Sequence, residues 1–486
     1  MRILVAVFFL LMSSSLFSQP NSVRLFGMGN VSIAVPDIEG EVFVNPAKAA
    51  RLTGVFLRFR PTYLRDSRSG DGSSSYLSGG SSYSSNYSSD NTQTDALAPV
   101  DAVISLGPLF IGGSASYQIN SWNSSNESGD QNPGYSQSNR SKYETNRPST
   151  SLSLLGAFDF GGISIGGAAT LSNMGQESKS SYINSSSPGS STSSEYEYKL
   201  DFSGTTLRAG FIAGSTETFE ISMYGNLDLS KSEDKPTRSV SNGVPQPLNE
   251  AYINRNESST SSLVAELRSR VGERLMFGGR LKRSSLSGDY FSKSRWYEQS
   301  IPLGVYEERK TGVDEMTVYE IGAGCSWQAP SGGTFSIEFV LSPTSSTSKS
   351  LFPTSGTYPD GRTYRKGDVS FERDDKSTAK TLRAGGELNV TEVLTLRAGS
   401  EVVWSSHEIS SKQQYDQRTE KTNGSTSATF YASGGLSYVL SPFRFDYAIA
   451  LVPNYNFPTL LFGPSFGYSI EQDVFVRHHL TLALQL

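Results

Sequence analysis

The chain has 486 residues, 18% of them charged, with a formal net charge of −5 and a pI near 5.5. This charge balance provides no basic surface for a nucleic acid. The single cysteine, Cys325, cannot form an internal disulfide. Composition therefore argues against a nucleic-acid-binding protein and a disulfide-stabilised scaffold, and stability must come from the fold itself.

The N-terminus reads as a secretory signal peptide. Arg2 supplies the positive charge, residues 3–12 are uninterruptedly apolar, and residues 13–19 are small and polar. We assign residues 1–19 to this signal on that pattern. Beyond it, no stretch approaches the roughly 18 consecutive apolar residues of a membrane-spanning helix. If the protein lies in a membrane, it must cross it as a closed β-barrel, because unpaired backbone groups cannot stay in hydrocarbon.

The next segment, residues 20–53, is neither signal nor strand. Residues 24–54 read RLFGMGNVSIAVPDIEGEVFVNPAKAARLTG. Asn45 suits a helix N-cap, Pro46 the first helical position and Gly54 the end of the helix. This pattern predicts a helix of one or two turns, which is too short to be stable alone. It must pack on another surface, and the interior of the barrel is the nearest one.

Residues 54–486 contain segments in which apolar and polar residues alternate, separated by turns and by long polar runs. The clearest example is residues 219–229, in which Phe219, Ile221 and Met223 alternate with polar residues. Similar patterns occur at 275–281, 335–341 and 480–486. Successive side chains of a strand face opposite sides, so one face can meet lipid and the other water. A soluble β-sandwich or adhesin also alternates and is the competing interpretation.

Short turns and long polar runs follow one another along the chain. The turns are expected at 107–108, 161–162, 214–217, 272–273, 330–333, 391–392 and 441–442. Long loops are expected after the first strand and near 122–147, 172–195, 232–258, 284–313, 342–377, 408–424 and 453–473. Bacterial barrels place long loops outside and short turns in the periplasm. The fold class is thus all-β, an antiparallel transmembrane β-barrel of about 14 to 16 strands, with an N-terminal plug that contains a short helix.

Charged residues occupy the polar faces of the predicted strands. On the lipid face such a residue would cost about 2 to 4 kcal/mol at the bilayer midplane. We therefore place the following residues on the lumen side: Glu266, Arg268, Arg270, Arg280, Lys282, Arg383, Glu387, Arg397 and Glu401. They could form a selectivity region in a pore. Alternatively, they form cross-strand ion pairs that join neighbouring strands, which is the interpretation that we favour.

An enzyme is not indicated. The histidines are His407, His478 and His479, and the last two are adjacent on a strand and face opposite sides. They cannot act as a pair, and neither has a ligand partner at metal-binding spacing. We expect no catalytic residues, no metal and no cofactor.

The N-terminal segment resembles the leader of the FadL family of outer-membrane transporters for long-chain fatty acids and aromatic hydrocarbons. The glycine-rich stretch, an acidic residue and the motif Asn45-Pro46-Ala47 match the family pattern. The resemblance implies that residues 20–53 form a hatch positioned by Asn45, Pro46 and Ala47. Five apolar hatch residues would then contact ligand: Leu25, Phe26, Ile33, Val42 and Phe43.

The resemblance implies a function: a channel in the outer membrane of a Gram-negative cell envelope, for passive uptake of small hydrophobic molecules. Outer-membrane lipid and a small hydrophobic ligand are the implied partners. PorV-like barrels share this leader and serve as subunits of a protein-secretion system. Such a subunit, which binds secretion-system proteins and transports no small molecule, is the alternative.

Overall fold

The computed structural model describes residues 24–25, 28, 30–37, 41–78, 81–132, 135–186, 190–215, 217–241, 244–245, 252–297, 305–330, 332–352, 355–357, 363–413, 419–424, 427–453 and 474–485. The signal peptide expected over residues 1–19, Phe26 and most of the loop expected at 453–473 lie outside these residues. Their assignments stay predictions.

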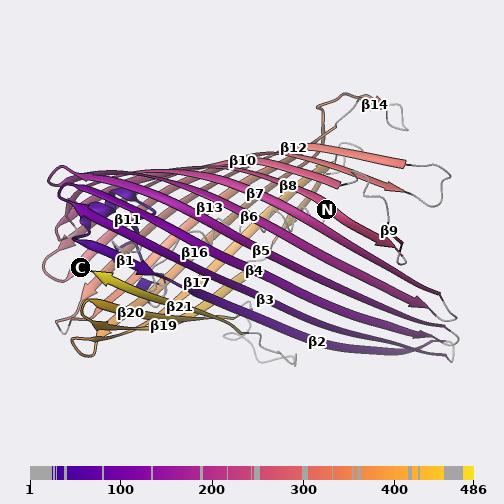
Figure 1. Ribbon diagram of the computed structural model, residues 1–486, viewed down its shortest axis with the longest axis horizontal. Coiled ribbons are helices and arrows are strands. Elements are labelled where there is room, and N and C mark those ends of the chain that lie inside the picture. The colour runs from indigo at the N-terminus through magenta and orange to yellow at the C-terminus, as the bar shows by residue number, and fades with distance from the viewer. Residues whose placement is uncertain are drawn as a thin grey trace.

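Nearly every described element is a strand (Figure 1). In chain order the elements are η1 (Pro46–Arg51), β1 (Val55–Phe59), β2 (Thr62–Ser78), β3 (Ser81–Leu106), β4 (Leu109–Asn132), β5 (Tyr135–Asp159), β6 (Ile163–Ser186), β7 (Ser190–Ser215), β8 (Phe219–Ser241), β9 (Val244–Pro245), β10 (Tyr252–Val271), β11 (Leu275–Tyr297), β12 (Val305–Gln328), β13 (Thr334–Leu351), β14 (Gly356–Thr357), β15 (Thr363–Tyr364), β16 (Val369–Asn389), β17 (Leu394–Gln413), β18 (Thr419–Asn423), β19 (Ser427–Leu440), β20 (Phe443–Pro453) and β21 (Val474–Gln485).

The strands close into a barrel. The long strands pair antiparallel in chain order, and β21 pairs with β20 on one side and with β1 and β2 on the other, while β14 and β15 form a separate two-stranded sheet. Strands β1 and β2 are one barrel strand interrupted at Arg60 and Pro61, where proline lacks the N–H that the ladder needs. Counted this way, with β18 joined to β19, the described residues form sixteen barrel strands. The predicted fold class and its upper strand count are confirmed.

Tight turns join the strands at one end of the barrel, at the predicted places. Gly107 and Gly272, with φ of 71° and 66°, lie in two of these turns. Such left-handed backbone favours glycine, because a Cβ would clash with its own backbone. The turns between β16 and β17 and between β19 and β20 also fall where the sequence predicts them.

At the opposite end of the barrel the prediction of long loops is wrong, because most of these residues form strands. Strand β4 runs to Asn132 and β5 begins at Tyr135, so most of residues 122–147 belong to the ladder. The 24 residues of β4 span about 80 Å, whereas the apolar belt of an outer-membrane barrel is about 25 Å tall. Above the lipid both faces of a strand meet water, so the ladder continues there without apolar alternation.

The outer face carries an apolar belt. The side chains of Leu154 and Leu281 are 67% and 59% exposed, and Phe335 and Ile321 are each 52% exposed. These residues come from β5, β11, β13 and β12, and similar ones follow on the other strands. A soluble monomer rarely exposes a contiguous apolar surface of this extent, so the belt indicates insertion in a bilayer. Within the described residues, no helix has the length and apolar character needed to cross a membrane.

Candidate functional site

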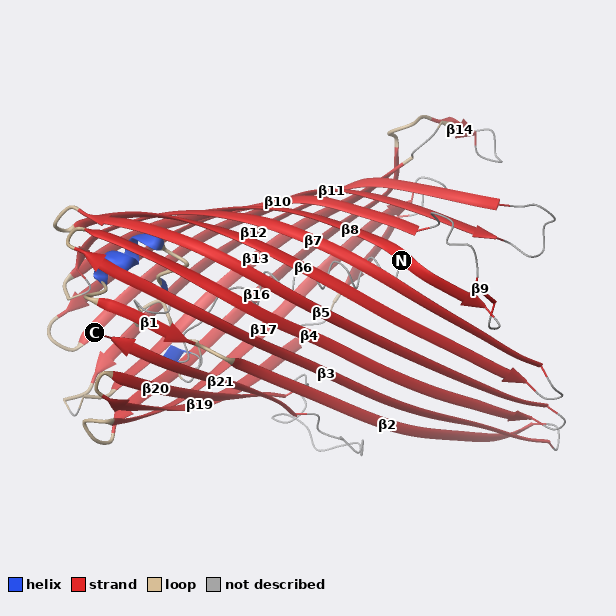
Figure 2. Ribbon diagram, in the orientation of Figure 1, coloured by secondary structure: helices blue, strands red, loops and turns tan. Residues whose placement is uncertain are grey.

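The described residues between 24 and 52, which we call the plug segment, pack against the inward-facing residues of the barrel. Met28, Val31 and Val42 are fully buried. The contacts fall near the strand ends that carry the tight turns, where Figure 2 shows the helical pieces of this segment. Three groups of contacts, on three parts of the wall, hold the plug segment.

The first group surrounds the backbone of Ser32, Ile33 and Ala34. Arg268 of β10 donates from Nε to the Ile33 carbonyl at 2.9 Å and from Nη2 to the Ser32 carbonyl at 3.0 Å. Glu338 of β13 accepts from the N–H groups of Ile33 and Ala34. Ser326 of β12 donates to the Ala34 carbonyl at 3.0 Å.

A wall glycine completes this group. An added Cβ on Gly278 of β11 would lie 2.4 Å from the Ile33 carbonyl oxygen. We call Arg268, Gly278, Ser326 and Glu338 the turn cradle. Four consecutive barrel strands contribute one residue each, and together they satisfy the polar backbone of a turn that the lumen would otherwise leave buried without partners.

The second group holds the helix. Asn45 caps η1, with its Oδ1 accepting from the Ala47 N–H at 3.2 Å, and Pro46 occupies the first turn, as the sequence predicts. The helix is 3₁₀ rather than α. Its start lies on wall glycines: an added Cβ on Gly166 of β6 would lie 2.5 Å from the Pro46 carbonyl carbon, and one on Gly210 of β7 would collide with the Asn45 amide.

The third group lies on β16 and β17. Arg24 donates from Nε to Glu387 Oε2 at 3.0 Å, and Asn30 donates to Glu401 Oε2 at 3.3 Å. An added Cβ on Gly385 would collide with the Met28 carbonyl oxygen. The three groups are therefore spread around the wall, and the plug segment closely approaches the sheet backbone in each of them.

Lys48 of η1 is buried at 2% exposure and pairs with Glu41 of the plug segment and with Glu266 of β10, the latter at 3.7 Å. Burial, together with the nearby guanidinium of Arg268, lowers the pKa of Lys48 to about 7. The carboxylates of Glu266 and Glu220 act in the opposite direction. The charge on Lys48 therefore depends on the carboxylates around it.

The other side of the plug segment is apolar. Val42, Phe43, Ala49 and Leu52 form one buried cluster with wall residues that belong to β1, β3 to β6 and β21: Phe56, Val103, Phe110, Leu155, Ala157, Ala168 and Ala483. We call this cluster the apolar seam. Leu25 packs separately with Met28, Val31 and Val35, and Ile33 lies in the turn cradle. The five predicted ligand-contacting residues thus do not form one surface, and Phe26 is outside the described residues.

The predicted lumen charges lie on the inward faces and are mostly paired. Arg280 contacts Glu266 at 2.8 Å and Glu320 at 3.7 Å. Glu387 and Arg397 are 3.4 Å apart, and Arg383 and Glu401 are 3.5 Å apart, across β16 and β17. Arg270 donates to Gln328 at 3.5 Å, and Lys282 lies opposite Glu320 in the ladder. A role in selectivity stays a prediction.

Sequence reasoning missed the wall glycines and Glu338. A partial signal was present: glycine doublets occur within strands at 112–113, 166–167, 278–279, 385–386 and 434–435. Strand glycines weaken a sheet unless another backbone approaches closely. In the doublets at 166–167, 278–279 and 385–386 one glycine lies against the plug segment and its neighbour does not, whereas the other two doublets lie against the barrel strands alone. In the described part of the chain, no three His, Cys, Asp or Glu residues gather to hold a metal.

Comparisons with known proteins give only distant structural neighbours. No protein-family model and no curated protein matches the chain. Among solved structures, the Pseudomonas putida toluene transporter TodX is 12% identical with a TM-score of 0.39, over 96% of this chain and 98% of TodX. The CymD monoaromatic hydrocarbon channel is 12% identical with a TM-score of 0.40, over 97% of this chain and 99% of that one. A Pseudomonas aeruginosa FadL homologue is 11% identical with a TM-score of 0.40, over 96% and 98%.

These neighbours include a homologue of the family that the leader resembles.

Proposed function

We propose that the protein is an outer-membrane channel for the passive entry of small hydrophobic molecules, with residues 20–53 acting as a hatch that closes the lumen. The apolar seam is the observation that carries this proposal. It gives the interior a continuous apolar contact between the plug segment and the wall, from Phe43 to Phe110 and Leu155.

A hydrophobic ligand needs an apolar surface to replace the water that it leaves. If the plug segment shifts away from the seam, the wall residues that it covers offer such a surface. The charged contacts of the turn cradle lie on β10 to β13, on strands that do not contribute to the seam. The plug segment can therefore stay attached by the cradle while the seam opens.

The first test is uptake of a labelled long-chain fatty acid by cells that lack their own channel and express this protein. Uptake should rise above that of cells with an empty vector, and Phe43→Asp should reduce it because a carboxylate is costly in the seam. The matched control is Ser285→Asp, because Ser285 lies on the exposed outer face above the belt. Ala265→Asp would not serve, because Ala265 lies on the outer belt. Equal uptake with the vector and with a folded wild-type barrel would refute the channel.

The gating proposal has its own test. Deleting residues 21–50 should raise the ion conductance of the purified barrel in planar bilayers, since the plug segment would no longer fill the lumen. Unchanged conductance and unchanged uptake in this deletion would contradict a hatch. A protein-secretion partner captured at the barrel, with no fatty-acid uptake, would instead favour the secretion-subunit alternative.

A further inference from the structure

The upper border of the apolar belt carries two basic side chains on the outer face. On β11 the outward positions Leu275, Phe277 and Leu281 are apolar and exposed, and the next outward position is Arg283. On β16 the outward positions Leu388 and Leu382 lead to Lys380 in the same way. Both basic residues are exposed. On these strands the belt thus ends in a positive charge.

Each of these charges lies beside an aromatic residue of the next strand. Arg283 is directly opposite Tyr319 of β12, and Lys380 is directly opposite Trp404 of β17. Tyrosine and tryptophan collect at membrane interfaces because one end of the ring is apolar and the other polar. Their position supports placing Arg283 and Lys380 at the level of the lipid headgroups.

The two charges have no carboxylate within ion-pairing distance among the described residues. Two outward-facing lysines higher on the barrel differ in this respect. Lys231 pairs with Glu257 at 2.9 Å, and Lys199 pairs with Asp201 at 3.2 Å. At the belt border of β11 and β16, Arg283 and Lys380 are therefore available to an anion outside the protein.

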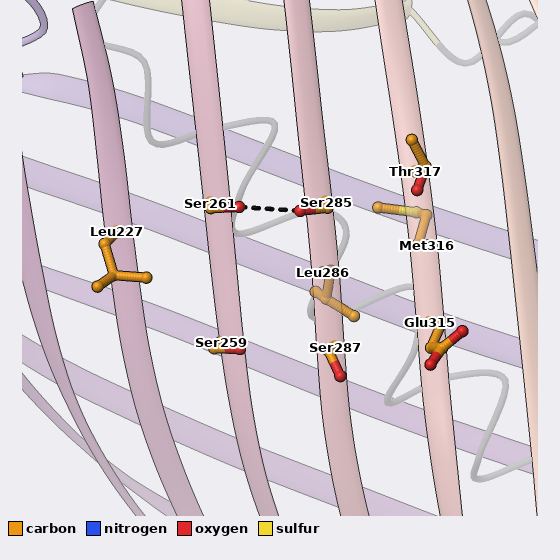
Figure 3. Close-up of a pocket in the computed structure, with 9 residues that line it drawn as sticks. All are labelled: Leu227, Ser259, Ser261, Ser285, Leu286, Ser287, Glu315, Met316 and Thr317. Atoms are coloured by element: carbon orange, nitrogen blue, oxygen red, sulfur yellow. Dashed lines mark hydrogen bonds between the residues drawn. The ribbon is translucent and has the colours of Figure 1, made fainter.

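Figure 3 shows a shallow groove of about 250 Å³ whose lining on β11 starts at Ser285, two residues along the strand from Arg283. Its lining includes Ser259, Ser261, Ser285 and Ser287, and the Ser261 and Ser285 hydroxyls are 2.8 Å apart. Hydroxyl groups on a wall match the hydroxyl groups of a sugar. The groove lies on β8 to β12, beside Arg283 and not beside Lys380, and offers its hydroxyls to headgroup sugars that extend from a phosphate at Arg283.

We propose that Arg283 and Lys380 bind the phosphates of an outer-leaflet glycolipid whose acyl chains lie along the apolar belt. Three strand spacings separate β11 from β16, and Lys380 lies in register with Leu281, two residues from Arg283, which together place the two residues about 16 Å apart along the sheet. A single phosphorylated disaccharide headgroup has comparable dimensions. The inference rests on the proposed place in the outer membrane, but it does not depend on transport.

The test measures lipid binding to the purified full-length barrel in dodecyl maltoside micelles, by native mass spectrometry. The probes are diphosphoryl lipid A and digalactosyl diacylglycerol, which lacks phosphate. The wild type should retain lipid A in preference to digalactosyl diacylglycerol. The double variant Arg283→Gln, Lys380→Gln should bind lipid A about 30-fold more weakly, because each basic residue near an anionic headgroup contributes about fivefold. The control Lys231→Gln should bind like the wild type.

Equal retention of both lipids by the wild type, or equal lipid A binding by the double variant, would overturn the proposal. So would saturation of the site by inorganic phosphate alone, since the occupant would then be a free anion. A wild-type barrel that shows the heat-dependent gel shift of a folded barrel but fails the uptake test would sink the channel and leave the lipid site standing. A chain that never folds in micelles would sink both.

Discussion

Replacing Gly278 by alanine should loosen the plug segment. The added Cβ would lie 2.4 Å from the Ile33 carbonyl oxygen and 2.7 Å from its carbonyl carbon. An ordinary contact needs about 3.4 Å or more, so the backbone at Ile33 must move by about 1 Å. That carbonyl also accepts from Arg268 at 2.9 Å, so the shift strains the turn cradle.

Overpacking of this kind costs about 1 to 3 kcal/mol. The docked state of the plug segment should then weaken about 5- to 150-fold. Tryptic cleavage after Lys48 reports undocking, because this side chain is 2% exposed in the docked state. Cleavage of Gly278→Ala should be faster than that of the wild type, and the open fraction in planar-bilayer recordings should rise with it.

The neighbouring residue is a matched control. An alanine Cβ at Gly279 would meet nothing within 4 Å, because this residue faces away from the lumen on the same strand. Gly279→Ala should leave cleavage unchanged. Similar rates for the two variants would refute the close approach of the plug segment to the wall. If Gly278→Ala does not fold, Gly166→Ala and its neighbour Gly167→Ala repeat the comparison on β6, another part of the wall.

Three further variants or conditions should act on the same equilibrium. Asn45→Ala removes the cap of η1 and should cost about 1 kcal/mol, seen as about fivefold faster cleavage after Lys48; an unchanged rate would contradict a capping role. Glu338→Gln loses the charge that accepts two N–H groups and should speed cleavage, whereas Glu315→Gln on the outer face should not. Raising the pH from 7 to 10 should strengthen docking, because the pKa of Lys48 is about 7 when docked and 10.5 ordinarily, so the undocked state holds more protons in this range. The open fraction in planar bilayers measures docking at each pH, and Lys48→Met should make this fraction less dependent on pH. The charged groups that face Lys48 are Glu41, Glu220, Glu266, Arg268 and Arg280.

The barrel and its short helix could be predicted from sequence because both depend on local patterns. Alternation sets the strands, glycine sets the tight turns, and Asn45 with Pro46 sets the start of η1. The serine-rich runs were wrongly predicted as loops because they lack apolar alternation. A strand needs this alternation only where one of its faces meets lipid. Hydroxyl pairs such as Ser230 with Ser258 at 2.7 Å continue the sheet above that level.

The attachment of the plug segment could not be predicted, because it joins residues far apart in the chain. Arg268 contacts Ile33 across 235 positions and Glu338 contacts Ile33 across 305. Such contacts depend on the register of every strand between them, which local patterns leave open. Three of the five glycine doublets within strands mark close approaches of the plug segment, but the doublets alone do not say which three or which segment approaches.

The position of these contacts also removes an apparent conflict between a charged lumen and a hydrophobic ligand. At the end of the barrel with tight turns, Arg268 and Glu338 bind plug backbone, and Glu387 and Glu401 bind Arg24 and Asn30, so these charges already have partners within the protein. The wall of β3 to β6 meets the plug segment through apolar side chains instead. A ligand that enters along this wall would replace the apolar contacts of Val42 and Phe43, whereas the ion pairs of Glu41 with Arg268 and of Lys48 with Glu266 lie on either side of these two residues. The polar contacts on one wall can thus hold the plug segment while its apolar contacts on the other wall separate.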